Sequence, residues 1–405
     1  MEKKNSIDWN SLSIALLLFV FTRPFFLWGL ISSTFIKFGL NIIIGVLLYR
    51  QFKKTTKNKN LIILYELIFI LYLFLSSLHG SNLNGIIEAL PISLFVCACF
   101  MNQYSMQKIG DYFMNIIITI SSIGFILFFL SRLGVPMPSF GTIEHYLEDR
   151  SYTIYPFYLI QNFDYSAYFR FQSFYDEPGV VGTLMSFFFL IKKGNFKDWH
   201  VWACLIIGIF SFSFFFYSVL IIYEVVSLLS ITTKKSTVVL ILVLFGGFFL
   251  VTRNNPEMRT LIWDRFEWDS QENKFKGDDR MHEEGEIAYK KLQGTAAFWW
   301  GLSQTERVTF MDYYQGSSSY KCVVAYNGMV FFALYVLFFG LLGWEYKSSK
   351  RDFILYLIIV LLCLYQRPNI YNVVYMFLFG LMARMKLQNA PIEKKSVKME
   401  EKNYV

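Results

Sequence analysis

An arginine and two adjacent carboxylates stand directly before an apolar run in the stretch RFQSFYDEPGVVG, residues 170–182. Arg170 opens the stretch, and Asp176 and Glu177 come just before Pro178. Proline suits the first turn of a helix and carboxylates are stabilised at its positive end, so one interpretation is a capped helix in which Arg170 neutralises a carboxylate. A single capping side chain would suffice, however, and a guanidinium beside an apolar boundary is costly unless it binds something. The other interpretation is therefore an anion-binding or catalytic site.

A second charged cluster, DDRMHEEGE at residues 278–286, precedes AYKKLQGTAAFWWGLS. A helix over residues 280–292 would place Arg280 one turn from Glu283 and Glu284. His282 lies between them, and an imidazole can accept or donate a proton near neutral pH. The cluster is thus either a solvated amphipathic helix or a second part of a site.

Three further arginines follow an apolar run upstream of this cluster: Arg253, Arg259 and Arg265. Guanidinium groups bind phosphate and pyrophosphate through paired hydrogen bonds. The sequence has no Walker lysine loop, glycine-rich dinucleotide turn, HExxH or GxSxG, and Asp278-Asp279 is the nearest approach to an acidic metal pair. We therefore expect no cofactor and no metal, and a substrate that arrives already activated.

The composition places these clusters on a membrane protein. Of 405 residues, 55% are hydrophobic and only 17% are charged, and the mean hydropathy is +0.41. A soluble domain of this size needs more polar surface than that. The net charge of +8 does not indicate nucleic acid, because lysine and arginine collect in short stretches between apolar runs, which is typical of cytoplasmic loops.

We expect an all-α polytopic membrane protein with about 12 transmembrane helices, since each span needs about 20 mostly apolar residues. The expected spans lie near residues 11–30, 32–49, 61–79, 85–101, 111–133, 178–191, 200–215, 217–231, 237–251, 323–343, 353–366 and 370–385. Residues 200–230 are interpreted as two spans, because the basic stretches at 234–235 and 347–351 then stay in the cytoplasm with both termini. The expected regions are N-terminal helices at 1–133, a first outer loop at 134–177, central helices at 178–251, a large outer loop with short helices at 252–321, C-terminal helices at 322–386 and a cytoplasmic tail at 387–405. Both charged clusters then lie at the outer surface, and long ordered loops usually carry function.

RFQSFYDEPGVVG resembles a motif of Wzy-type O-antigen and capsular repeat-unit polymerases, in which an arginine precedes Glu-Pro and glycines at a helix start. The later sequence adds to the similarity with that family and with the related O-antigen ligases: DDRMHEEGEIAYKKL, the FWWGLS turn, and SSSYKCVVAYNGMVFFALYVLFF. The resemblance covers the central and C-terminal two-thirds of the chain, and the first spans match only in hydropathy. It implies a GT-C-like glycosyltransferase architecture in the bacterial inner membrane, with the active face in the periplasm.

The resemblance also implies roles for individual residues. Arg170 and Arg280 match the arginines that face a lipid-linked pyrophosphate, whose departure develops negative charge that they would stabilise. A general base near the acceptor hydroxyl contributes roughly 10²–10⁴-fold, and Glu177 and His282 are the candidates for it. Glu177 equally qualifies as the group that holds Arg170 in position. The remaining expected substrate-binding residues are Arg253, Arg259, Arg265 and Tyr320.

The implied function is polymerisation: a growing glycan moves from undecaprenyl pyrophosphate to the non-reducing-end sugar of a lipid-linked repeat unit. The implied partners are those lipid-linked oligosaccharides, membrane lipids, a chain-length regulator and a flippase, and no nucleic acid. An O-antigen ligase, which transfers the glycan to lipid A core, is the nearest alternative. Ligases carry a histidine where this chain has Ser317–Tyr320, which favours the polymerase. A lipid-linked oligosaccharide flippase is the alternative of another class, and it would need charges inside the spans rather than long outer loops.

Overall fold

The computed structural model describes residues 8–28, 103–145, 150–162, 170–192, 194–228, 267–270, 274–276, 283–303, 319–347, 349–367 and 372–384, together with isolated positions elsewhere. This part of the chain is mostly helical, which confirms the expected all-α class in its coarse form. The predicted spans near 32–49, 61–79, 85–101 and 237–251 lie outside the described residues, apart from single positions within them.

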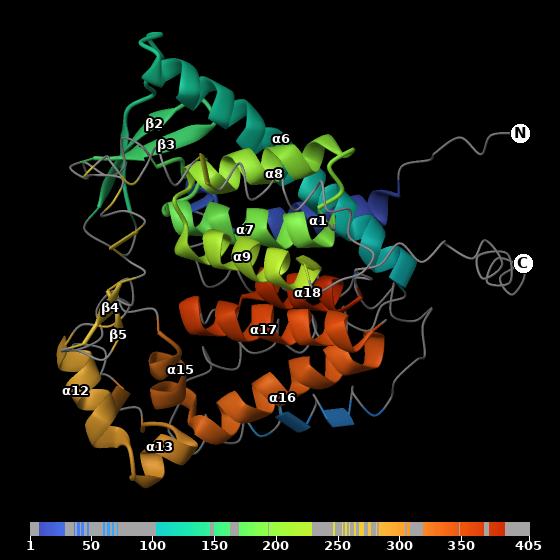
Figure 1. The fold of residues 1–405 in the computed structure, drawn as a ribbon, viewed down its shortest axis with the longest axis vertical. Helices are drawn as coiled ribbons and strands as arrows, with labels where there is room; N and C mark the ends of the chain where they lie inside the picture. The colour runs from blue at the N-terminus through green and yellow to red at the C-terminus, as the bar shows by residue number, and fades with distance from the viewer. Residues whose placement is uncertain are drawn as a thin grey trace, which may run out of the picture.

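Among the described residues, eight helices form the main bundle (Figure 1). Their bounds are α1 Trp9–Phe21, α6 Gln103–Arg132, α7 Pro178–Ile191, α8 Trp199–Phe210, α9 Phe214–Leu228, α16 Met329–Tyr346, α17 Lys350–Gln366 and α18 Val373–Ala383. Two of them, over Met106–Arg132 and Met329–Tyr346, are long and apolar enough to cross a membrane. Several of the others are shorter apolar helices of 10–17 residues. Among the described residues this gives membrane association weak support.

The helix breaks have local causes. The stretch predicted to hold two spans forms two helices, α8 and α9, as far as Leu228, and Phe212 at the break has a positive φ of 49°. The predicted first span ends early, because Arg23 has a φ of 58° and Pro24 has no N–H to continue the helix; a short 3₁₀ turn, η1 (Phe25–Leu27), follows. The predicted span at 323–343 is divided at Gly328 into α15 (Tyr320–Asn327) and α16.

The helices alternate in direction between two ends of the bundle. At one end, which we call the basic end, Lys108 lies 3.7 Å from Asp8, and Lys192 Nζ lies 3.1 Å from Asp111 Oδ1. Arg384, after the last turn of α18, donates to Met106 Sδ at 2.7 Å and joins α18 to the start of α6 there. Helices α1, α6, α8 and α17 therefore begin at the basic end, and α7, α9, α16 and α18 end there.

The opposite end, which we call the sheet end, carries a small antiparallel sheet that the sequence did not predict. Its strands are β1 (Thr142–Glu144), β2 (Ser151–Tyr155) and β3 (Tyr158–Gln161), and they lie within the first predicted outer loop. A Cβ on Gly124 of α6 would lie 2.3 Å from the Phe157 carbonyl oxygen, so this glycine lets the β2–β3 turn rest on the helix. Leu159 N–H donates to Ser173 O at 2.8 Å and ties the sheet to the segment before α7.

The second predicted outer loop contributes further elements on the same side of the bundle (Figure 1): the short strands β4 (Trp268–Asp269) and β5 (Lys274–Phe275), and the helices α12 (Glu283–Leu292) and α13 (Ala296–Trp300). Helix α12 ends where the sequence predicted and begins three residues later than predicted. Gly301 and Gly328 both have positive φ and bring the chain around α13 close to α15, since a Cβ on Gly328 would lie 2.3 Å from Trp299 O.

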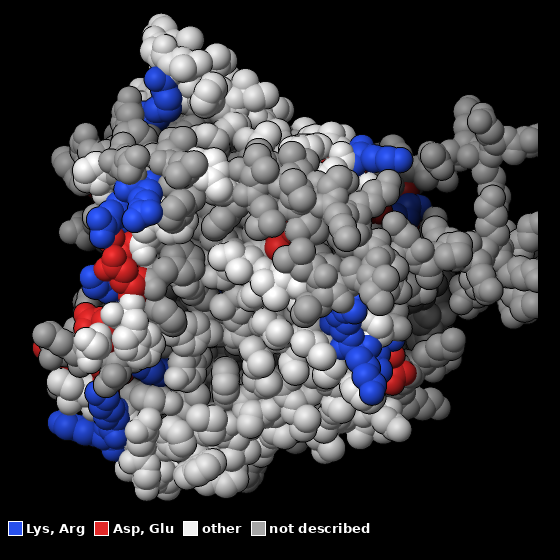
Figure 2. Space-filling view, in the orientation of Figure 1, with Lys and Arg blue, Asp and Glu red and all other residues white. Residues whose placement is uncertain are grey.

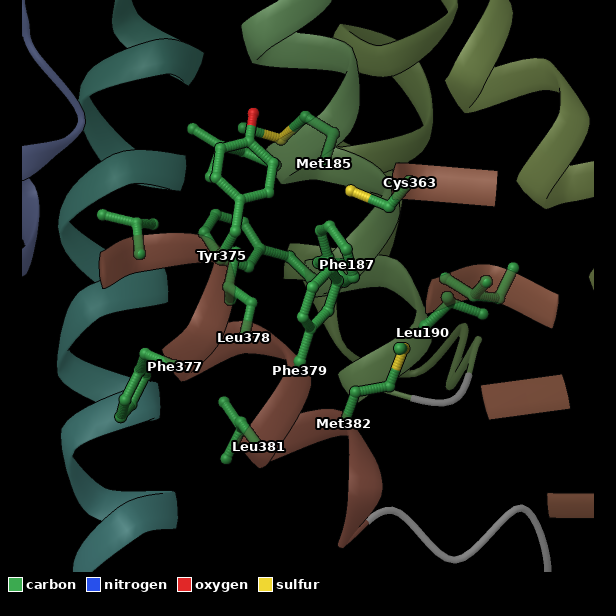
Figure 3. Packing of buried hydrophobic residues seen from close by; sticks show 14 of the residues in the cluster. Met185, Phe187, Leu190, Cys363, Tyr375, Phe377, Leu378, Phe379, Leu381 and Met382 are labelled. Atoms are coloured by element: carbon green, nitrogen blue, oxygen red, sulfur yellow. The ribbon is translucent and has the colours of Figure 1, made fainter. Parts of the chain in front are cut away.

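The core of the bundle is packed largely with aromatic side chains. Phe187 of α7 and Phe379 of α18 pack edge to face with ring centroids 5.7 Å apart (Figure 3). The ring of Phe339 in α16 lies 5.0 Å from that of Phe379. Phe377 points from α18 toward α6, where its ring is 6.3 Å from that of Phe113. This packing fixes α7 against α18 and therefore fixes the position of the charged residues at the start of α7.

Candidate functional site

Glu177 occupies the N-cap position of α7, but its side chain makes no capping hydrogen bond. Its carboxylate instead accepts from Arg367, with Nη2 2.7 Å from Oε2. The interpretation of the stretch as a simple capped helix is therefore wrong for this side chain. Pro178 starts the helix as expected, because the first turn needs no N–H from that residue.

Arg367 is placed by the end of α17. Its backbone N–H donates to Cys363 O at 2.7 Å, and the following Pro368 disfavours helical backbone at this position. Its side chain is 9% exposed, whereas that of Glu177 is 37% exposed. Burial alone would lower the pKa of Arg367, but the charge of Glu177 opposes it and the pKa is raised above its ordinary value. The group is therefore a buried, permanent cation.

Gly179 makes room for this guanidinium. A Cβ at this position would lie 2.0 Å from Nη2 of Arg367 and 3.0 Å from Cζ. The guanidinium thus lies against the first turn of α7. The Glu-Pro-Gly sequence has a physical explanation: the glutamate binds the arginine, the proline starts the helix, and the glycine leaves the space.

The neighbouring carboxylate, Asp176, has a different partner. His145, which follows β1, places its Nε2 3.4 Å from Asp176 Oδ2, and its side chain is only 5% exposed. The indole of Trp28 packs edge to face on the His145 ring at 4.8 Å. The two adjacent acids therefore join two different parts of the chain to the start of α7, Asp176 the first outer loop and Glu177 the end of α17.

The residues between Arg170 and Asp176 are held by buried contacts. The Tyr175 hydroxyl donates to Thr22 Oγ1 at 3.1 Å, and the Ser173 and Ser121 hydroxyls lie 3.1 Å apart. Phe171 N–H donates to Phe210 O at the end of α8. Arg170 is partly buried and lies near enough to Tyr217 of α9 to interact with it electrostatically. Arg170 and Glu177 are therefore both at the sheet end of the bundle.

Of the expected site residues between 253 and 282, Arg265, Arg280 and His282 lie outside the described residues. Arg253 is exposed, and Arg259 belongs to a surface ion-pair network in which its Nε lies 3.1 Å from Asp264 Oδ1. Lys276 lies 2.8 Å from Glu267 in the same network and is the first cause of a lowered pKa for that glutamate. Exposed pairs of this kind contribute little to stability.

Tyr320 starts α15 and packs against the same helix end as Arg367. Its ring is stacked with that of Tyr365 in α17 at 5.9 Å, two residues before Arg367. The next residue, Lys321, pairs with Glu286 of α12 and lies 5.8 Å from the Tyr289 ring centroid. The end of α17 thus contacts Glu177 of the first motif and Tyr320 of α15, and Lys321 connects α15 to Glu286 of the second cluster.

Sequence reasoning missed two residues of this arrangement. Arg367 had a usable signal, because it follows a predicted span on the outer side, where the positive-inside rule disfavours arginine. His145 had none, since an isolated histidine in a loop has no distinctive spacing. Within the described part of the chain, no group of three or more histidine, cysteine or acidic residues could hold a metal ion.

Together the described residues provide a fixed cation at a helix N-terminus, a second arginine at the same end of the bundle, and an acidic pair that joins other parts of the chain to this helix start. That arrangement suits an anionic group at the end of an apolar bundle. No family model, curated protein or solved structure matches the chain.

Proposed function

We propose that the chain is a membrane polysaccharide polymerase that transfers a growing glycan from undecaprenyl pyrophosphate to the non-reducing-end sugar of a lipid-linked repeat unit. The observation that carries this proposal is the ion pair between Glu177 and Arg367 at the sheet end of an apolar bundle. A lipid-linked diphosphate needs cations beside a hydrocarbon surface, and these two features occur together here. The resemblance of RFQSFYDEPGVVG to polymerase motifs supports the same function.

The arrangement of the bundle supports a multi-pass protein with its sheet end outward. On the face seen in Figure 2, the charged residues that the structure describes lie mostly toward two opposite sides of the molecule. Large apolar side chains are exposed on several helices of the bundle, including Ile126 of α6, Leu337 of α16 and Ile354 of α17. The lysines at the basic end favour the cytoplasm for that end, and both termini then lie there.

In the proposed reaction, the bond from the donor sugar to pyrophosphate breaks as the acceptor hydroxyl attacks. Arg170 and Arg280 are proposed to stabilise the charge that develops on the leaving group. Glu177 and His282 are the proposed proton acceptors. The contact of Glu177 with Arg367 supports a positioning role for this glutamate, with Arg367 as the arginine that it holds. The proposed protein partners are a chain-length regulator and a flippase.

A deletion strain tests the proposal and separates it from the alternatives. Loss of a polymerase leaves single repeat units attached to the final acceptor, whereas loss of a ligase leaves none attached. Loss of a flippase leaves lipid-linked units on the cytoplasmic leaflet. We expect single units, and complementation with Arg170→Ala or Arg280→Ala should restore membrane-inserted protein without polymer. Full-length polymer from both variants would overturn their assignment.

A further inference from the structure

We propose that Arg367 and the N-terminus of α7 form a diphosphate-binding site whose resting occupant is the Glu177 carboxylate. The identity of the anion as a lipid-linked diphosphate rests on the proposed function. The assignment of Arg367 itself rests on contacts within the structure. It adds a binding residue that lies 190 residues from Glu177 along the chain.

The first argument is the state of the guanidinium. Arg367 is 9% exposed, and Nη2 is the nitrogen that donates to Glu177. Within the described ranges, no protein group accepts a hydrogen bond from its Nε or Nη1. A guanidinium carries five N–H donors in a fixed fork, and neither Nε nor Nη1 of Arg367 is among the fully buried side-chain nitrogens without a partner, so these donors are accessible from outside the protein. An oxyanion bound at the open edge of the fork would satisfy them.

The second argument is the position of this cation against a helix start. Helix α7 has 14 residues, its N-cap side chain does not cap it, and the guanidinium lies where a Cβ of Gly179 would be. The N-terminus of a helix carries partial positive charge, so a cation there is unfavourable unless an anion lies between them. Glu177 supplies one partly exposed negative charge in direct contact, and Asp176, which pairs with His145, adds a weaker electrostatic interaction. A diphosphate carries more charge and more acceptor oxygens than this one carboxylate.

The location selects the class of anion. The site lies at the end of helices with exposed aliphatic side chains, so a diphosphate at this level could carry a polyprenyl chain alongside the bundle. Free pyrophosphate offers the same acceptor oxygens without the chain. Both share the chemistry that Arg367 would recognise, and the two sources are compared directly in the experiment.

Glu177 is then a positioning residue that competes with the ligand. It holds the guanidinium fork over Gly179 when the site is empty, and an incoming diphosphate takes its place or shares the fork. Removing its charge should therefore favour binding of the anion and impair the orientation needed for turnover. This opposite effect on binding and turnover would not arise from a purely structural role.

The experiment measures binding of inorganic pyrophosphate and of undecaprenyl pyrophosphate to the full-length protein in lipid nanodiscs. Arg367→Gln should weaken both by roughly 10- to 100-fold, because it removes charge-assisted hydrogen bonds. Arg367→Lys keeps the charge and the pairing with Glu177 but loses the fork, and it should weaken binding several-fold without changing the melting temperature. Glu177→Gln should bind pyrophosphate more tightly than the wild type while its turnover number falls.

Arg384→Gln is the matched control, because Arg384 is another buried arginine but lies at the basic end. It should bind both probes as the wild type does, whatever its effect on stability. Unchanged binding in Arg367→Lys and Arg367→Gln would overturn the site. If the wild type forms polymer while these variants bind normally, the site fails and the proposed function stands. If the wild type binds diphosphate through Arg367 but forms no polymer, the function fails and the site stands.

Discussion

Substitution of Gly179 by alanine probes the contact at the start of α7 without removing a charged group. The added methyl carbon would lie 2.0 Å from Nη2 of Arg367, and carbon–nitrogen contact needs roughly 3.5 Å. The guanidinium must therefore move by about 1.5 Å, which it can do because it is the end of a flexible side chain. The 2.7 Å hydrogen bond to Glu177 is lost in that movement.

The expected cost follows from the exposure of the two partners. Glu177 is 37% exposed, so solvent screens the pair, and we assign its loss about 1–2 kcal/mol. Alanine gains about 0.5–1 kcal/mol over glycine in a helix, which offsets part of this loss. Gly340→Ala is the matched control, because no described residue has an atom within 4 Å of a Cβ built at Gly340 in α16. The alanine variant at 179 should therefore be less stable than the one at 340 by about 1–2 kcal/mol.

Denaturant unfolding of the purified protein in detergent, followed by tryptophan fluorescence, measures this difference. In a Glu177→Gln background the difference between the two alanine variants should shrink, since the pair is already weakened. Pyrophosphate binding should fall by about tenfold in the variant at Gly179 and stay unchanged in the variant at Gly340. Equal stability and equal binding in the two variants would refute the placement of Arg367 over this turn.

Two further predictions concern the ends of the bundle. Gly124→Ala should destabilise the protein by about 1–3 kcal/mol, because its methyl group meets the backbone oxygen of Phe157, which cannot swing away; hydrogen exchange in the β2–β3 turn should rise, and unchanged exchange would contradict the contact. At the basic end, burial raises the pKa of Asp198. The hydrogen bonds from His200 and the charges of His200 and Lys192 together lower this pKa by more than burial raises it, so the net shift is downward. The stability that Asp198 contributes is therefore present above its ordinary pKa of 3.8 and lost as pH falls through the lower folded value, and Asp198→Asn should flatten that part of the unfolding curve measured against pH.

Local features of the chain could be predicted because their causes are local. Helix α7 spans 178–191 as expected, since a proline and an apolar run define its start and its length. The division of 200–230 into α8 and α9 followed from the placement of lysines, which depends only on charge along the chain. The end of α12 at Leu292 followed from the helical spacing of its charged and apolar residues.

Other features depend on contacts between distant residues and gave no local pattern. The strands β1–β3 have three to five residues each, too few for a clear alternation, and their pairing is fixed by packing on α6 and on the segment before α7. The ion pair of Glu177 with Arg367 joins residues 190 positions apart, so no local pattern indicates it. The apolar run predicts one continuous helix through Gly328, whereas the positive φ of Gly328 separates α15 from α16.

The central claim is that this chain polymerises lipid-linked repeat units without nucleotide or metal. The most direct measurement is incubation of the purified protein in nanodiscs with undecaprenyl-pyrophosphate-linked repeat units in the presence of a chelator, with the products separated by length. We predict a ladder of glycans on the lipid, together with one released undecaprenyl pyrophosphate for each linkage formed. Repeat units that stay single in the presence of folded, membrane-embedded protein would contradict the claim.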